Sequence, residues 1–147
     1  MPRVIENLDE EECLRLLGAT QVGRLAYTGR QGPSVLPVVY KMHEGSIIFH
    51  PLQGTFTEED LRTGIAHAEY QVTFEIDQID PLARWGWGVQ VVGSAHHVDT
   101  EAERASIVGA GADPFPWAEA EAAPLMRVKP IHVRGRRSYL RTMQAES

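Results

Sequence analysis

The segments VGRLAY at 22–27, VLPVVY at 35–40 and IIFH at 47–50, followed by Pro51 and Gly54-Thr55, decide the fold of this chain. Glycines lie in both turns between them, at Gly29, Gly32 and Gly45, and glycine tolerates the positive φ angles of tight turns. Strands of about five residues joined by short turns are typical of an antiparallel meander. The stretch from Val22 to Thr55 therefore predicts three consecutive antiparallel strands.

The segments around this meander add helices and further strands. We expect a first helix capped by Asn7 or Asp9. We expect a second helix over 58–67 with Thr57 as its cap, and a third over 101–108 after the cap Asp99-Thr100. We expect strands at 72–77, 86–95, 126–129 and 132–135, and an irregular connection at 113–124. The expected fold is mostly β, an antiparallel, Greek-key-like barrel with flanking helices, because closure of a barrel removes exposed strand edges.

Composition sets limits on the size and surroundings of the protein. The 147 residues, 43% of them hydrophobic, are enough for one core, so we expect a single domain over 1–147. The formal charge of −6 argues against a nucleic-acid partner. The single cysteine, Cys13, cannot form an internal disulfide. The sequence shows neither the pattern of a signal peptide nor an apolar run long enough to span a membrane. We therefore expect a cytoplasmic protein with no membrane partner.

Several segments follow one another in an order that carries more information than any one of them. They are Cys13–Leu17, Val22–Ala26, Leu36–Tyr40, Ile48–His50, Val72–Asp77, Gly86–Ala95, Arg127–Pro130 and Val133–Arg137. In this order the chain resembles the pyridoxamine 5′-phosphate oxidase-like superfamily of FMN-binding split-barrel proteins, and within it the nitroimidazole-resistance branch. The resemblance implies a split β-barrel that forms a homodimer, with two flavin sites at the subunit interface.

The resemblance also implies a set of cofactor-binding residues. A flat ring needs apolar walls and backbone polar groups, which a strand such as Pro37 to Tyr40 offers, while the flavin itself supplies the redox chemistry. The implied cofactor-binding residues are Pro37, Val38, Val39, Tyr40, Phe49, His50, Gly54, Thr55, Arg62, Trp87 and Arg136.

The phosphate end of the implied site departs from the family pattern. Phe56 stands where the family commonly has a lysine, and the acids at 58–60 would repel a phosphate. Donors remain on Gly54, Thr55, His50 and Arg62. The basic segment with Arg134, Arg136, Arg137 and Arg141 is either a solvated strand or a source of arginines that reach the phosphate from the dimer interface.

Two function hypotheses follow from this site. The first is an FMN-dependent oxidoreductase of unknown substrate with no catalytic residue assigned. The alternative is a binding or sensing module that holds a deazaflavin, haem or another planar ligand without turnover, and a barrel that has lost its ligand is a third possibility.

Individual residues also have plainer interpretations. His50 could equally be a strand-end histidine that forms a hydrogen bond with the backbone. Trp85 and Trp87 are candidates for packing in the core or at the dimer surface. Trp87 is the better candidate of the two for stacking on a ligand. His96 and His97 point to opposite sides of a strand, so we expect no metal site.

Overall fold

The computed structural model describes residues 2–29, 32–51, 69–114 and 125–141. Along these residues the elements are β1 (Arg3–Leu8), α1 (Glu10–Ala19), β2 (Val22–Gly29), β3 (Gly32–His43), β4 (Ser46–Phe49), β5 (Glu69–Asp80), β6 (Trp85–His97), α3 (Glu101–Gly109) and β7 (Met126–Leu140). The helix predicted at 58–67 and most of the irregular connection predicted at 113–124 lie outside the described residues.

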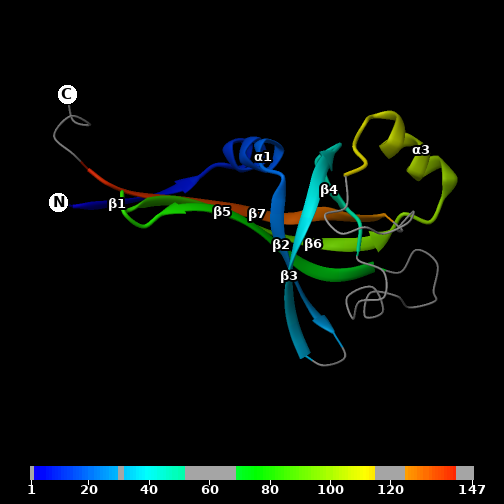
Figure 1. Ribbon diagram of the computed structural model, residues 1–147, viewed down its shortest axis with the longest axis horizontal. Coiled ribbons are helices and arrows are strands. Elements are labelled where there is room, and N and C mark those ends of the chain that lie inside the picture. The colour runs from blue at the N-terminus through cyan, green and yellow to red at the C-terminus, as the bar shows by residue number, and fades with distance from the viewer. Residues whose placement is uncertain (1, 30–31, 52–68, 115–124, 142–147) are drawn as a thin grey trace.

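Six of the strands close into a ring (Figure 1). The sheet runs in the order β7-β4-β3-β2-β5-β6, every neighbouring pair is antiparallel, and β6 pairs again with β7. Because β5 returns to lie beside β2, the strands β2 to β5 form a Greek key. The predicted antiparallel, Greek-key-like β-barrel with flanking helices is confirmed.

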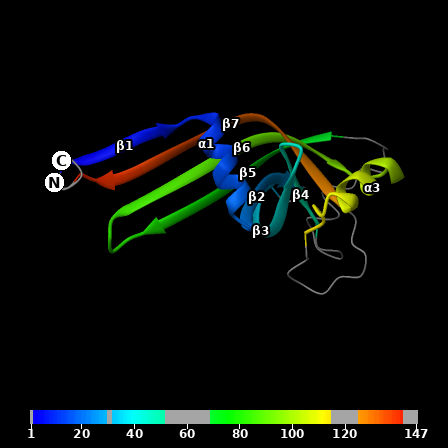
Figure 2. The same cartoon turned by 90° about the horizontal axis from the view of Figure 1, so that it is seen from above.

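Four strands continue past the barrel as a flat extension, here called the arm (Figures 1 and 2). The arm consists of residues 3–8, 77–88 and 135–140, in the spatial order β1-β7-β6-β5. The sequence prediction missed β1, which pairs with the end of β7 over Arg3↔Leu140 to Leu8↔Gly135. The arm therefore joins the two ends of the described chain in one sheet.

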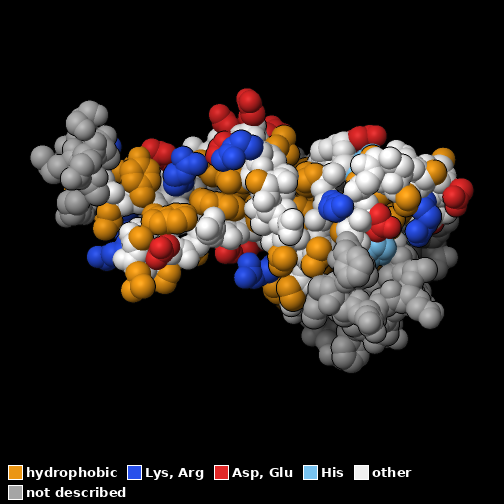
Figure 3. All heavy atoms as spheres, turned by 45° about the horizontal axis from the view of Figure 1, so that its top comes forward, with side chains coloured by type: hydrophobic (Ala, Val, Ile, Leu, Met, Phe, Trp, Pro, Cys, Tyr) orange, Lys and Arg blue, Asp and Glu red, His pale blue; other side chains and the backbone are white. Residues whose placement is uncertain are grey.

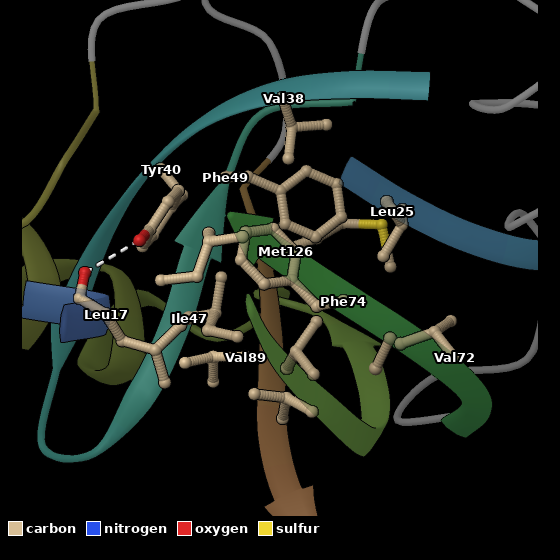
Figure 4. Packing of buried hydrophobic residues seen from close by; sticks show 14 of the residues in the cluster. Leu17, Leu25, Val38, Tyr40, Ile47, Phe49, Val72, Phe74, Val89 and Met126 are labelled. Carbon is tan, nitrogen blue, oxygen red and sulfur yellow. Dashed lines mark hydrogen bonds between the residues drawn. The ribbon is translucent and has the colours of Figure 1, made fainter. Parts of the chain in front are cut away.

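The barrel interior is apolar, and residues of α1 pack into the same core (Figure 4). Asp9 caps α1 by accepting a hydrogen bond from the Glu12 N–H at 2.8 Å, and Cys13, Leu16 and Leu17 are buried on the helix face that meets the barrel. The Tyr40 hydroxyl donates to the Leu17 carbonyl at 2.7 Å, and burial raises the Tyr40 pKa. This hydrogen bond fixes α1 against β3.

A bulge allows β7 to run unbroken where the sequence predicted two closing strands. The register shifts between Val92↔His132 and Gly93↔Pro130, so that Ile131 is an extra residue and Pro130 lies at the irregular point, where a strand tolerates proline. A Cβ on Gly93 would lie 2.6 Å from Val128 Cγ1, so only glycine permits this close approach. The extra residue lies on β7, and Gly93 on β6 permits the close approach of the two strands beside it.

The second helix, α3, begins at the predicted cap. Thr100 Oγ1 accepts from the Glu103 N–H at 3.2 Å, and Ile107 packs with Ile48, Val98, Ala112 and Leu125 in a small second core. Within the described ranges, no helix has the length and apolar character needed to cross a bilayer.

Candidate functional site

Strand β3 presents two different faces. Val38 and Tyr40 are buried inside the barrel, whereas Pro37 is exposed and Val39 is half-buried on the outside. Of the four predicted residues on β3, only Pro37 and Val39 therefore offer side chains to an external ligand. Val38 and Tyr40 have only backbone atoms to offer.

An apolar area lies on the outside of the barrel along β2 and β3, and we call it the outer strip: Val22, Val35, Pro37 and Val39. Val22 pairs with Val39, and both Val22 and Val35 are more than half exposed, at 53% and 67%. Val35 lies four residues from Val39 on the same face of β3, opposite Ala26, and exposed apolar side chains that gather on one face can form ligand or protein contact sites. The outer strip combines two predicted site residues, Pro37 and Val39, with two valines that the sequence analysis did not single out, and Arg24 lies opposite Pro37 within it.

The edge of β3 beside the outer strip is open. Residues 32–39 pair with β2, but pairing with β4 begins only at Tyr40↔Phe49, so within the described residues no strand covers the other edge of 33–39. Backbone polar groups on that edge have no strand partner among the described residues, although Pro33 and Pro37 carry no N–H. The open edge and the outer strip together provide the polar and apolar contacts that a planar heterocycle requires.

The predicted site residues that follow β3 differ in burial and in contacts, and some of them lie outside the described residues. Phe49 is fully buried in the core, and His50 follows it with its Nε2 atom 2.6 Å from Asp113 Oδ1 and its side chain only 9% exposed. His50 is thus already bound to a carboxylate. Gly54, Thr55 and Arg62 lie outside the described residues.

Trp87 and Arg136 lie on adjacent strands but on opposite faces of the arm. Trp87 is directly opposite Arg137, packs against the core and faces the α1 side, where Figure 3 shows hydrophobic side chains along the arm. Arg136 is opposite Gly88, is exposed, and has no ion-pair partner among the described residues. A single ligand bound to one protomer therefore cannot contact both side chains on one face of the sheet.

The face of the arm that carries Arg136 is hollowed, and we call this hollow the glycine groove. Cavities of about 480 and 690 Å³ adjoin over Gly88, and Glu75 and Arg136 line both. Gly86 and Gly88 form its floor because they carry no side chains. Ile5 and Ile79 flank the groove towards the tip of the arm, 63% and 69% exposed.

Two carboxylates on β5 border the glycine groove and share one arginine. Arg24 Nη1 lies 3.3 Å from Asp77 Oδ2 and 3.5 Å from Glu75 Oε1, and that Glu75 oxygen is buried without a hydrogen-bond partner in the described structure. Burial, reinforced by Asp77, raises the pKa of Glu75 to about 7 although Arg24 acts in the opposite direction. Sequence analysis missed this pair, although the spacing of two already placed both acids on one face.

A second charged cluster joins α3 to the barrel. His96 Nε2 lies 2.9 Å from Glu103 Oε2, and Arg127 Nη1 donates to the same oxygen at 3.2 Å. Burial acts to raise the Glu103 pKa, but the hydrogen bonds and charges of His96 and Arg127 together lower it. No group of three or more His, Cys, Asp or Glu side chains in the described ranges has an arrangement that could hold a metal ion.

Comparison with known proteins identifies the family. The family model for pyridoxamine 5′-phosphate oxidase matches residues 9–137. The chain belongs to this family. This member of the pyridoxamine 5′-phosphate oxidase family shares its fold with a proposed pyridoxamine 5′-phosphate oxidase from Corynebacterium glutamicum. The two structures superpose with a TM-score of 0.74 and 23% sequence identity, over 93% of this chain and 100% of that chain.

Two mycobacterial proteins are also similar to this family member. The FAD-binding protein of Mycobacterium smegmatis is 26% identical at a TM-score of 0.71, with 93% of this chain and 99% of that chain covered. An uncharacterized protein of Mycobacterium tuberculosis is 32% identical over 96 residues, which are 65% of this chain. The match spans only 62% of the length of that curated relative.

Proposed function

We propose that this member of the pyridoxamine 5′-phosphate oxidase family is an FMN-dependent oxidoreductase that works as a homodimer, with a substrate still to be identified. The observation that carries the proposal is the combination of the outer strip with the open edge of β3 at 33–39. Similarity to a protein described as FAD-binding supports a flavin as the ligand.

The residues present fit the ring part of a flavin. Pro37 and Val39 provide an apolar wall, and the uncovered backbone of β3 provides hydrogen-bonding groups for the polar edge of the ring. When bound, a flavin supplies the hydride or electron transfer, so the protein has to bind and orient it. His50 is held by Asp113, which leaves the phosphate to Gly54, Thr55 and Arg62 in this proposal.

The visible absorption spectrum of the purified protein tests the proposal directly. We expect a flavin spectrum, or quenching of flavin fluorescence when FMN is added to colourless protein. Titrations with FAD, a deazaflavin and haem measure preference among the alternative ligands. Protein that binds none of the four would overturn the proposal, and flavin that is bound but not reduced by any nicotinamide donor would favour the binding or sensing module.

A pair of matched variants tests the position of the ring. Val22 and Val108 are equally exposed, at 53% and 50%, but only Val22 belongs to the outer strip. We expect Val22→Glu to weaken FMN binding by about tenfold or more, since a carboxylate would have to be desolvated beneath the ring. Val108→Glu on α3 is the control and leaves the affinity unchanged; equal effects would place the ring elsewhere.

A further inference from the structure

Arg24 borders the outer strip on the side away from the open edge of β3. It lies between Val22 and Ala26 on the outward face of β2, directly opposite Pro37 of β3. On its other side Arg24 is paired with Glu75 of β5. The Arg24 side chain is 56% exposed, so its charge lies at the surface of the apolar wall. A ligand on the outer strip therefore has the open edge of β3 along one side and Arg24 along the other.

Two carboxylates hold the Arg24 guanidinium from the β5 side. Its Nη1 atom lies 3.3 Å from Asp77 Oδ2 and 3.5 Å from Glu75 Oε1, so both contacts use the same nitrogen. A guanidinium carries N–H donors on every one of its nitrogens, arranged as a planar fork. The ion pair thus fixes the position of Arg24 and leaves its other donors for a ligand.

Arg24 is better placed than the other cation on this face. Among the described residues of β2 and β3, the basic side chains are Arg24 and Lys41. Lys41 lies two residues beyond Val39 on the same face of β3, but its Nζ atom donates to the Gly111 carbonyl at 3.1 Å. Lys41 is therefore engaged by the turn after α3, whereas Arg24 lies beside Pro37.

The ring of a flavin has polar atoms on both of its long sides and gains negative charge on reduction. A hydride from a nicotinamide donor adds two electrons and one proton to the neutral oxidised ring, which gives the anionic reduced form. A cation beside the ring therefore favours the reduced form. We propose that Arg24 contacts the flavin ring on the outer strip and stabilises its reduced form, an inference that rests on the proposed function.

The proposal couples reduction of the ring to the protonation of Glu75. Glu75 faces Arg24 of β2, Asp77 of its own strand and, across the uncharged residues of β6, Arg134 and Arg136 of β7. Burial, reinforced by Asp77, raises the Glu75 pKa to about 7. When Arg24 is shared with a negatively charged ring, it stabilises the Glu75 carboxylate less, and the pKa rises further. Above about pH 7, reduction is therefore accompanied by uptake of a proton at Glu75.

Matched arginine variants test the proposal through affinity and potential. Arg24 is 56% exposed and its partner Asp77 is 29% exposed, while Arg15 on α1 is 62% exposed and its partner Glu12 is 28% exposed. Fluorescence quenching gives the dissociation constant of oxidised FMN. The midpoint potential of bound FMN, measured against a dye of known potential, then gives the constant for reduced FMN.

We expect Arg24→Met to weaken the binding of reduced FMN by about tenfold more than that of oxidised FMN, because it removes a charge-assisted contact. A tenfold difference lowers the midpoint potential by about 30 mV for a two-electron couple. Arg15→Met is the control and leaves the potential unchanged. Arg24→Lys keeps the charge and should recover most of the preference for reduced FMN.

The pH dependence of the potential adds a readout that a purely structural role of Arg24 would not move. Above about pH 7 the potential of the wild type should fall more steeply with pH than that of Glu75→Gln, because only the wild type takes up a proton at residue 75. Equal slopes for the two proteins contradict the proposal. This comparison keeps Arg24 in place, so it decides the matter even if Arg24→Met does not fold.

The outcomes separate this inference from the proposed function. Protein that binds neither oxidised nor reduced FMN removes the flavin function and the role of Arg24 together. Protein that binds FMN, but in which Arg24→Met weakens both forms equally or shifts the potential no more than Arg15→Met does, overturns the role of Arg24 alone.

Discussion

Two glutamates, Glu103 on α3 and Glu75 on β5, each lie beside an arginine, yet their pKa values shift in opposite directions. For Glu103, burial is outweighed by hydrogen bonds and charges from His96 and Arg127, and the pKa falls. For Glu75, burial and the neighbouring Asp77 outweigh Arg24, and the pKa rises to about 7. Burial acts to raise both pKa values, and the balance between burial and the neighbouring groups decides the direction of each shift.

The difference in sign gives the two glutamates opposite effects on stability as the pH changes. Because the pKa of Glu103 is lowered, its contribution to stability is present above the unfolded-state value of about 4.5 and is lost as the pH falls through the lower native value. The contribution of ionised Glu75 to stability has the opposite sign, because the native state holds the Glu75 proton more tightly than the unfolded chain does. Its charge costs stability progressively from about pH 4.5 to 7, and in full above pH 7.

The largest effect is expected from Arg127→Met. The Arg127 and Glu103 side chains are only 13% and 20% exposed, and removal of the guanidinium leaves the partly buried Glu103 with His96. Breaking a buried pair from one side typically costs about 3 kcal/mol, measured as a loss in the free energy of unfolding by chemical denaturation. Arg84→Met on the exposed arm tip is the control and should change stability by less than about 0.5 kcal/mol. Equal losses for the two variants would show that the Glu103 cluster does not stabilise the fold.

A smaller effect of opposite sign is expected from Glu75→Gln in protein diluted to its monomeric form. At pH 8 the variant avoids the cost of a poorly compensated charge and should be more stable by about 1 kcal/mol, a value reduced for the exposure of the site. At pH 5 the difference should nearly vanish, because native Glu75 is then protonated. Urea denaturation at both pH values measures this, and a constant difference would contradict the raised pKa.

Asp77→Asn tests the cause of the Glu75 shift without changing Glu75 itself. Loss of the like charge leaves Arg24 to Glu75 alone, so the pKa of Glu75 should move from about 7 towards its ordinary value of 4.5. Carbon-13 NMR titration of the Glu75 carboxyl group in monomeric protein measures this pKa. Since burial is the larger cause, the pKa should remain above 4.5; an unchanged midpoint would mean that Asp77 has no part in the shift.

The smallest effect is expected from Arg15→Ala. Arg15 donates to Glu12 at 2.8 and 2.6 Å on α1, but both side chains are open to solvent and Glu12 keeps Arg137 at 3.3 Å. An exposed pair of this kind contributes little, so the thermal midpoint should be unchanged within error. A clear drop would mean that exposure is not what separates this pair from the Glu103 cluster.

The elements defined by local pattern were predictable from the sequence. The meander at 22–50 and the caps Asp9 and Thr100 depend on neighbouring residues, and the structure contains them. β1 was missed because Arg3–Leu8 becomes a strand only by pairing with residues 135–140, far away in sequence. The closing strands were split at Pro130 because the bulge that accommodates this proline requires Gly93 on another strand.

The candidate site was predictable only in part, for a similar reason. Pro37 to Tyr40 was correctly placed on a strand, but a strand has two faces, and burial of Val38 and Tyr40 leaves only alternate side chains for a ligand. The engagement of His50 by Asp113 joins segments 63 positions apart and has no local signal. The positions of Gly54, Thr55, Arg62 and the proposed dimer remain predictions.

The last strand, β7, pairs with β1, β4 and β6, and this has a consequence for synthesis of the chain. Until β7 has been synthesised and has left the ribosome, β4 and β6 lack the strand that joins them. A nascent chain stalled at that stage exposes two unpaired strand edges, a form prone to aggregate and to bind chaperones. Folding of this barrel is therefore expected to be completed only after translation has passed residue 140.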